Sequence, residues 1–585
     1  MLAIILSLIV VSFIFLTLGD LLLSTYNKIS RKEESYSLFD TFLLAGLLAI
    51  SSFAFPSNHY VLSAFLVFCI GYWIVRAKRA KTYFRRIKGL VIHIPPIFLF
   101  LIAGAIFAYI MIAVWAPGVF DAFFYHQQNI RWNEEFSAVP GLANLEDRFG
   151  FNSNYLLLSA LFSFRFLFGE AMYCLQTTVV IWAMAWILYE IARSRFEIKR
   201  VLLLFFFMLF FFIQAYTILT TTSTDIVPNI IIFCFFARFI LYPQSLSRSN
   251  LYIMLVPVML ITLKVSVAPI LIISVFALYH LIRNKDYTVF VLLALLSILV
   301  LFPWLIRNVI VSGYLVYPIY EIDLFSFDWK LPKEVAMLQH GFVKDCGVVA
   351  VDGIVSSLSG ISSFLQPHTF ISNCVYFIII LSPISFICTM ARNAKERNVS
   401  IILLYGTLLA IIIFWFVNAP DPRFISGVLY IAAFYAICLL FPNNKEIHLK
   451  SIIGYGVISI FVFILFAWGI KRSINYCSDY GADNVNKNKR PIADVFIKPY
   501  SYKTQLTGAG IDTDKMKEFY LNNGIIIYLC ESEVGGRPVC FDHLPSTVEE
   551  TNWTSKYQDI KTIEARGVDL QSGFRPKAVK KTESQ

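Results

Sequence analysis

The stretch 91–114, VIHIPPIFLFLIAGAIFAYIMIAV, decides the fold, because it runs without a single Asp, Glu, Lys or Arg. A helix needs about 20 apolar residues to cross the roughly 30 Å of hydrocarbon in a bilayer. The stretch 452–470, IIGYGVISIFVFILFAWGI, has the same character. Both runs are continuous rather than alternating, which predicts membrane-spanning helices and not the strands of a membrane barrel.

The composition of the whole chain agrees with these two stretches. Of its 585 residues 58% are hydrophobic and 15% are charged, and the mean hydropathy is +0.68. Soluble domains have about 45–50% apolar and about 25% charged residues, so a water-soluble fold is excluded. The net charge of +11 lies in short connectors between apolar runs, where membrane topology requires it. We therefore expect no nucleic acid partner.

The basic connectors set the expected orientation. The stretch 76–88 has seven basic residues and no acidic one, which predicts a cytoplasmic location. The following helix then runs outward. All basic connectors lie on the cytoplasmic side only if two segments do not cross the membrane as single helices. We expect 152–168 to be interfacial or re-entrant, and 250–283 to be two half-helices that meet near Lys264 rather than one helix.

These choices predict an all-α polytopic membrane protein of about 13–15 membrane segments with a small extracytoplasmic C-terminal α/β appendage. The first segment is expected to be a retained helix rather than a cleaved signal peptide. The predicted parts are membrane helices at 1–114, a first exterior loop at 115–151, membrane helices at 152–306, a second exterior loop at 307–368, membrane helices at 369–470 and the exterior domain at 471–585.

Most of the ten cysteines give no indication of a catalytic or metal-binding role. Cys530 and Cys540 flank a hairpin-like stretch on the expected exterior side, where a disulfide can form. No His or Cys spacing resembles a zinc site. Five others lie in apolar runs, where cysteine usually behaves as a small core residue: Cys69, Cys174, Cys234, Cys388 and Cys438.

The first exterior loop contains the strongest candidate for a catalytic residue. Asp121 opens the stretch DAFFYH, which ends at His126, a few residues after a helix leaves the membrane. An acid at this level can meet the head group of a lipid-linked substrate, although it can also simply cap a short helix. Further along the loop lie second candidates that are either metal ligands and phosphate contacts or solvated charges: Glu134, Glu135, Glu146, Asp147, Arg131 and Arg148.

Three later positions add candidates for substrate binding. Asp225 ends the hydroxyl-rich stretch TTST at an outer helix end, where it either binds a ligand or caps the next helix. Lys264 lies inside an apolar segment, which makes it a functional candidate by default. The stretch APDPRF, 419–424, holds Asp421 and Arg423 in a turn made rigid by two prolines.

These residues resemble the GT-C superfamily of multi-spanning glycosyltransferases, which use polyprenyl-phosphate-linked sugars on the exoplasmic side. The shared plan is an acid in the first long exterior loop, a long later exterior loop and a Pro-x-Arg-aromatic turn. Nearly the whole chain also resembles a group of uncharacterised bacterial membrane proteins. The stretches that carry this second resemblance are 130–132 (IRW), 139–144 (VPGLAN), 148–153 (RFGFNS), 312–314 (SGY), 419–424 and 573–575 (GFR).

The resemblance implies a GT-C-like helical bundle with Asp121 in the position of the catalytic acid. The superfamily's usual second acid beside it is absent, so the use of a divalent metal stays open, and no other cofactor is expected. The implied partners are a polyprenyl-phosphate-linked sugar, membrane lipid, and a glycan, lipid or protein acceptor at the outer face of the cytoplasmic membrane. A surface-polysaccharide polymerase or ligase, and a lipid-carrier flippase or transporter, are the alternatives.

Overall fold

The structure is a computed structural model in which part of the chain is described. The described residues are 1–31, 48–114, 121–215, 219, 221–247, 250–392, 399–441, 447–477, 496–498, 512, 514–531, 533–534, 537–538, 540–548 and 557–577. The beginning of the first exterior loop, 115–120, and the glycines at 535–536 lie outside them.

Within these residues, nine helices are long and apolar enough to cross a membrane. A helix that is apolar all round is stable only inside a large core or in lipid, which identifies the chain as a multi-pass membrane protein. The nine are α1 (Leu2–Ser30), α5 (Pro96–Ala113), α9 (Leu175–Ser194), α13 with its preceding turn (Val265–Arg283), α14 (Tyr287–Ser312), α17 (Phe370–Arg392), α18 (Val399–Asn418), α19 with its preceding turn (Pro422–Leu440) and α20 (Ser451–Cys477).

The 13–15 membrane segments expected include half-helices as well as full spans, so the nine spanning helices of the described residues account for only part of them. A tenth span results if α3 (His59–Val75) and α4 (Ala77–Ile92), which meet at 86°, are counted as one bent pair. The remaining apolar helices in the described part are too short to span in the usual way. They are the pair α7 (Asn154–Leu161) and α8 (Arg165–Phe168), α11 (Ile226–Leu241) and α12 (Asn250–Leu263).

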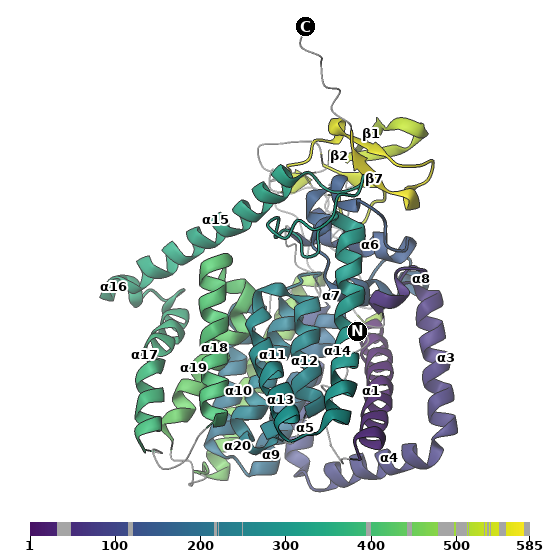
Figure 1. Cartoon of the computed structure of the whole chain (residues 1–585). Helices are drawn as coiled ribbons and strands as arrows, with labels where there is room; N and C mark the ends of the chain where they lie inside the picture. The colour runs from purple at the N-terminus through teal and green to yellow at the C-terminus, as the bar shows by residue number, and fades with distance from the viewer. Residues whose placement is uncertain are drawn as a thin grey trace.

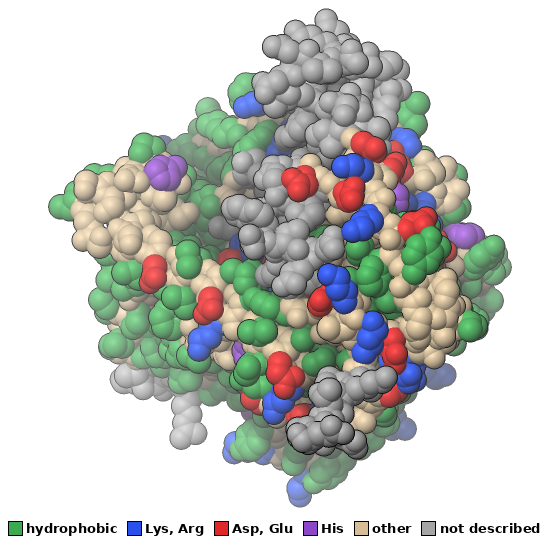
Figure 2. Space-filling view, turned by 90° about the horizontal axis from the view of Figure 1, so that it is seen from above, with side chains coloured by type: hydrophobic (Ala, Val, Ile, Leu, Met, Phe, Trp, Pro, Cys, Tyr) green, Lys and Arg blue, Asp and Glu red, His purple; other side chains and the backbone are tan. Residues whose placement is uncertain are grey.

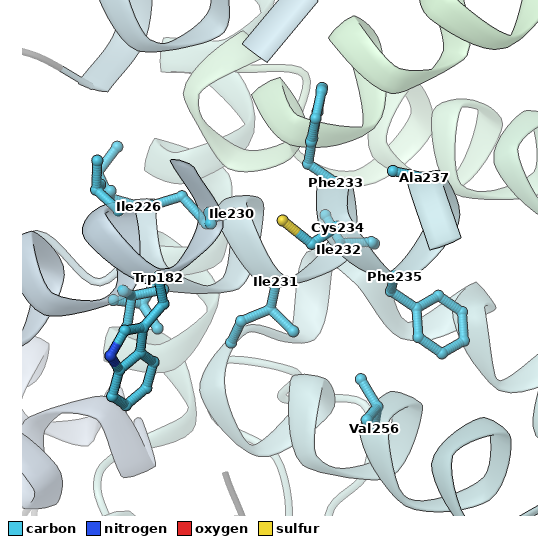
Figure 3. Packing of buried hydrophobic residues seen from close by; sticks show 14 of the residues in the cluster. Trp182, Ile226, Ile230, Ile231, Ile232, Phe233, Cys234, Phe235, Ala237 and Val256 are labelled. Atoms are coloured by element: carbon cyan, nitrogen blue, oxygen red, sulfur yellow. The ribbon is translucent and has the colours of Figure 1, made fainter. Parts of the chain in front are cut away.

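The core of the bundle is built around α11. Nearly every residue of this helix is buried, and its side chains extend in all directions, so that Ile226 and Phe235 contribute to the same core (Figure 3). Trp182 of α9 and Val256 of α12 belong to the surrounding buried cluster. The short α11 can stay apolar on every side because neighbouring helices, rather than lipid, surround it.

The broken helix predicted at Lys264 is confirmed. α12 ends at Leu263, a short 3₁₀ turn covers Val265–Ile270, and α13 (Leu271–Arg283) returns along α12. Ser274 Oγ donates a hydrogen bond to the carbonyl of Ile253 at 3.0 Å, which fixes the two helices as an antiparallel hairpin. Lys264 therefore lies at the tip of the hairpin, where backbone without regular helix lines the interior of the protein.

The first half of the segment 152–168 is enclosed by the protein. All residues of α7 are buried inside the protein, and Ser153 Oγ, at its start, donates to the carbonyl of Leu263 at 2.8 Å. Phe164, which has a left-handed backbone with φ of 51°, separates α7 from α8. The prediction that this segment does not cross the membrane as one helix agrees with the structure. Because α7 is buried while α8 exposes Phe166 and Leu167, the choice between an interfacial and a re-entrant position stays a prediction.

The basic connectors lie at one end of the bundle. Stretch 76–88 is not a loop: it forms most of α4, which runs across that end, opposite the C-terminal strands (Figure 1). The ring of Phe98 at the start of α5 lies 5.3 Å from the ring of Phe196 in the basic connector between α9 and α10 (Ile198–Phe210). An isolated antiparallel β-bridge joins Glu197 to His448, so the connector before α20 lies beside the connector between α9 and α10. We call this the α4 end, and the opposite one the strand end.

The described C-terminal residues form strands and 3₁₀ turns, so the predicted α/β appendage is mainly β. The largest sheet has the order β1-β2-β5, with β1 antiparallel and β5 parallel to β2. Cys530 and Cys540 are joined by a disulfide, which confirms that prediction. The strands are β1 (Met516–Tyr520), β2 (Ile526–Cys530), β3 (Glu533–Val534), β4 (Arg537–Pro538), β5 (Ser546–Thr547), β6 (Ile563–Ala565) and β7 (Phe574–Pro576).

This strand domain shares a core with the first loop. Trp132, Leu145 and Phe149 of the loop are buried in one cluster with Ile527 and Phe574. The amide of Phe574 donates to the carbonyl of Pro140 at 3.0 Å. The preceding Gly573 has φ of +86° and approaches Pro140 so closely that any side chain would collide with it. The end of the chain is thus fitted onto the segment that begins with Asp121.

Candidate functional site

Asp121 stands at the beginning of an irregular helix at the strand end. It precedes a π-helical turn, Ala122–His126, which continues into α6 (Gln127–Glu135). Such turns are rare and are frequently found at functional sites. The side chain of Asp121 makes no capping hydrogen bond to this helix, so the structural role considered for it is not the one observed. About 30% of the side chain is exposed.

Two arginines from different loops face the carboxylate of Asp121. Arg148 Nη1 lies 3.7 Å from Oδ1, and Arg423 Nη1 lies 3.6 Å from Oδ2. The guanidinium carbon of Arg148 lies 5.0 Å from the ring centre of Phe124 and 5.4 Å from that of Phe342, so aromatic rings surround a buried cation. The Arg148 side chain is therefore fixed in place, whereas that of Arg423 is 52% exposed.

Asp225 and Lys264 form an ion pair beside these residues. Asp225 lies just before α11, and its carboxylate accepts from Nζ of Lys264 instead of capping the helix. Lys264 Nζ also lies 3.9 Å from the ring centre of Phe424. Burial alone would raise the pKa of Asp225, but the positive charges of Lys264 and Arg423 outweigh it and hold the pKa below its usual range. Asp225 is therefore ionised at neutral pH.

The turn before α19 aims Arg423 at the site. Asp421 Oδ1 accepts from the backbone N–H of Arg423 at 2.9 Å, and Oδ2 accepts from its Nε at 2.8 Å. Trp415 Nε1 donates to the Asp421 carbonyl at 2.7 Å. Asn229 of α11 donates to the Arg423 carbonyl at 2.9 Å and accepts from the amide of Gly427 at 2.8 Å. The turn is thus attached to α18 on one side and to the buried helix α11 on the other.

A long helix from the second loop closes over this turn. α15 (Lys333–Leu358) brings Gly347 so near to the turn that an added Cβ would lie 2.6 Å from Pro420 Cδ and 3.0 Å from the amide nitrogen of Asp421. The same helix contributes the Phe342 ring over Arg148. The second loop therefore forms a wall of the site, which is visible as α15 crossing above α18 and α19 in Figure 1.

His126 is a buried neutral base close to these charges. Burial lowers its pKa to about 4, although the negative charges of Asp121 and Asp225 act in the opposite direction. Within the described part of the chain, its Nδ1 atom has no hydrogen-bond partner. A neutral imidazole with an unused nitrogen can accept a proton or a hydrogen bond. Its near-complete burial leaves Asp121 as the more accessible proton acceptor.

Arg131 does not join this group. It pairs along α6 with Glu135 at 2.6 Å and with Glu134 at 3.4 Å. The expectation that Glu134 and Glu135 are both solvated is wrong for Glu134, which is buried and accepts from Nε of Arg165 at 2.8 Å. Arg165 Nη1 in turn donates to Asp542 of the strand domain at 2.6 Å. Glu134 thus helps to attach that domain.

Glu146 and Asp147 are likewise fully buried and are not solvated loop charges. Thr547 Oγ1 donates to Glu146 Oε2 at 3.2 Å, and the amide of Tyr557 donates to Asp147 Oδ2 at 2.6 Å. Both acids join the loop to the strand domain. Among the residues that the structure describes, no group of three or more His, Cys, Asp or Glu side chains is arranged to hold a metal ion.

The structure thus brings together six of the eight predicted site residues, as two ion-paired groups joined through Phe424 and Asn229. We call them the charged cluster: Asp121, Arg148, Asp225, Lys264, Asp421 and Arg423. His126 borders the cluster and Arg131 lies apart from it. Sequence reasoning missed Phe342, Phe424, Asn229 and Gly347. Of these, only Phe424 had a signal, since it ends the Pro-x-Arg-aromatic stretch.

The chain was also compared with known proteins. No curated protein and no solved structure matches it. One family model does match, that of a domain of unknown function, DUF8201, and the match covers residues 1–430. These residues include α1 to α18 and every member of the charged cluster. Because the match extends over more than half of the 585 residues, the chain belongs to the DUF8201 family.

Proposed function

We propose that the protein is a membrane glycosyltransferase that moves a sugar from a polyprenyl-phosphate carrier to a hydroxyl acceptor at the outer face of the cytoplasmic membrane. The observation that carries the proposal is the position of Asp121 between Arg148 and Arg423. Transfer from a phosphate carrier needs a carboxylate for the acceptor proton and cations for the departing phosphate in one place.

In the proposed reaction, the acceptor oxygen forms a bond to the anomeric carbon of the sugar. The bond from that carbon to the carrier phosphate breaks, and its electron pair leaves with the phosphate. Asp121 accepts the proton of the acceptor hydroxyl. Its carboxylate is a weak base, with an ordinary pKa of about 3.9, but a phosphate whose charge is matched leaves readily, so strong basicity is not required.

The cations differ in their suitability for the phosphate. Lys264 is paired with Asp225, and aromatic rings enclose Arg148, so both are committed to contacts within the protein. Arg423 combines the largest exposed fraction with a planar fork of donors, of which Nε is used by Asp421. Arg423 is therefore assigned the first contact with the phosphate, while Lys264 and Arg148 add positive charge behind it.

A lipid carrier also needs an apolar route to the cluster. The last turns of α18, just before the stretch 419–424, expose Ile413, Phe416 and Val417 at 55%, 59% and 58%. In a membrane this surface faces acyl chains, and the charged turn follows immediately in the sequence. The polyprenyl chain can lie along α18 with its phosphate at Arg423. This juxtaposition of lipid-facing surface and cationic turn supports a lipid-linked donor over a soluble one.

The test uses cells that lack the gene and express variants at equal levels, with analysis of the sugar composition of their envelope glycans. Arg423→Lys keeps the charge but loses the bidentate fork, so transfer should fall by about 10–100-fold. Glu135→Gln, at a partly exposed residue that pairs with Arg131, serves as the matched control and should keep wild-type activity. An unchanged glycan composition in cells without the gene would refute the proposal.

The arginines on both sides of Asp121 also favour a second candidate, a surface-polysaccharide polymerase or ligase that relies on arginines rather than on an acid. The two candidates differ in their response to Asp121→Asn. A polymerase of that kind should keep its activity in this variant and lose it when Arg148 or Arg423 is replaced. A glycosyltransferase should lose activity in all three.

A further inference from the structure

Helix α4, far from the charged cluster, has two chemically distinct faces. Phe84, Ile87 and Val91 recur at intervals of three and four residues, which places them on one side of the helix. The flank next to this side carries four basic residues: Lys78, Lys81, Arg85 and Lys88. No acidic residue occurs in α4, so its charges cannot pair within the helix.

The direction of α4 is built into the protein. It meets α3 at 86° and runs across the end of the bundle (Figure 1). Arg79 of α4 donates from Nε and Nη2 to the buried carboxylate of Asp20 in α1, at 2.8 Å and 2.7 Å. Tyr72 of α3 donates to the same carboxylate at 2.6 Å. This network fixes the elbow between α3 and α4, so that α4 lies at right angles to its neighbour.

The apolar and basic side chains named above have no polar or charged protein partner in the described part of the structure. Phe84 is 72% exposed, and Ile87 and Val91 are exposed as well. The four basic side chains are also exposed, and no described carboxylate pairs with them. Arg79 differs from these four residues because its guanidinium is hydrogen-bonded to the carboxylate of Asp20. A helix that exposes an apolar side and a cationic side has the pattern of an amphipathic helix that lies in the plane of a membrane surface.

We infer that α4 is a binding site for the head groups of anionic phospholipids in the leaflet on the α4 side. The apolar side chains enter the acyl region, while the four basic side chains meet the lipid phosphates and their additional negative charge. A neutral leaflet satisfies the apolar face equally well but leaves the four cations unmatched. Charge complementarity therefore selects the anionic lipid. This binding is independent of sugar transfer at the other end of the bundle.

The test measures lipid preference of the purified full chain. The protein is stripped of lipid in a neutral detergent and titrated with phosphatidylglycerol or phosphatidylcholine, and bound lipid is counted by native mass spectrometry. Wild type should bind phosphatidylglycerol at least about tenfold more tightly at low salt, since each cation near an anionic surface contributes about fivefold. The preference should weaken toward 1 M salt, where charge interactions extend only about 3 Å.

Two variants with the same change in charge separate the site from general electrostatics. K78Q/K81Q/R85Q/K88Q should bind the two lipids almost equally. K515Q/K517Q/K561Q/K577Q removes four exposed lysines of the strand domain and should keep the wild-type preference. An equal loss in both variants would overturn the inference, as would a wild-type preference that is absent or insensitive to salt. The salt titration needs no variant and therefore decides the matter even if a variant fails to fold.

Discussion

Arg423 Nη1 lies 3.6 Å from Asp121 Oδ2, although the two residues belong to different loops of the chain. The contact exists because the turn before α19 is attached to α11 through Asn229 and the helix after Asp121 is attached to the strand domain, where the amide of Phe541 donates to the carbonyl of Phe123 at 2.8 Å. Each partner is held by the protein on its own side. The pair is thus preorganised, which is the condition for a catalytic group to act.

Asp121→Asn should abolish most of the sugar transfer, while the variant should still fold. The amide keeps the size of the carboxylate but cannot accept the proton, so the rate should fall by about 10²–10⁴. Thermal stability should change little, because the side chain is partly exposed and makes no capping hydrogen bond. The measurement is transfer from a polyprenyl-phosphate sugar by the purified enzyme, together with its melting temperature. Wild-type turnover by this variant would remove Asp121 from the mechanism.

The buried pair of Asp225 and Lys264 should show strong coupling. Asp225→Asn or Lys264→Met alone leaves an unpaired buried charge, which should destabilise the protein by about 3–5 kcal/mol. The double variant should recover most of this loss, because neither charge remains. The exposed pair of Lys515 and Glu531, 3.5 Å apart, is the control, and its removal should cost less than about 1 kcal/mol. Additive losses for the buried pair would contradict direct pairing.

The same pair predicts a dependence of stability on pH. The pKa of Asp225 is lower in the folded protein than in the unfolded chain, where it is about 3.9. Its contribution to stability is therefore fully present above about pH 4 and is lost as the pH falls through the folded pKa. Wild type should lose stability over this acidic range. The variant D225N/K264M should lack this component, as unfolding followed by tryptophan fluorescence would reveal.

Gly347→Ala should disturb the site from the side of α15. The new methyl group would meet Pro420 and the amide of Asp421, so the turn that carries Arg423 must shift. A displacement of about 1 Å can cost up to about 100-fold in rate. Gly353→Ala in the same helix is the control, because its methyl group meets nothing within 4 Å. That variant should keep full activity and gain about 0.5–1 kcal/mol in helix stability.

The orientation of the bundle can be tested with a native residue. Cys346 of α15 is exposed and unpaired, so a membrane-impermeant maleimide should label it in intact cells. Burial raises the pKa of this thiol, and mildly alkaline buffer will speed the reaction. A cysteine introduced at Lys81 in α4 should be labelled only after permeabilisation. The reverse pattern would place the charged cluster on the cytoplasmic side and exclude the proposed donor chemistry there.

Some features of this fold follow from the sequence because they depend on neighbouring residues. Long apolar runs predict the spanning helices, and the need to keep all basic connectors on one side predicts the break near Lys264. The disulfide follows from the short separation of Cys530 and Cys540. The cytoplasmic location of the basic stretch 76–88 stays a prediction, and its helical form was missed because basic clusters usually suggest loops.

Other features depend on contacts between distant segments and leave no local trace. Glu134 looks like a surface charge until Arg165 and the strand domain cover it. The aromatic enclosure of Arg148 needs Phe342, which only the path of α15 brings near. Gly347 carries no signal at all, because its importance comes from Pro420 passing beside it. The candidate acids could thus be listed from the sequence, but not their division into a charged cluster and structural contacts.

The bond between the amide of Phe574 and the carbonyl of Pro140 has a consequence for biogenesis. Pro140 leaves the ribosome long before Phe574 is made, so the segment that begins with Asp121 must wait for almost the entire chain before its last partner arrives. Until then the segment lacks β7, which contributes Phe574 to their shared core. A chain truncated before β7 would therefore keep the described spanning helices but leave the Pro140 carbonyl without the amide of Phe574.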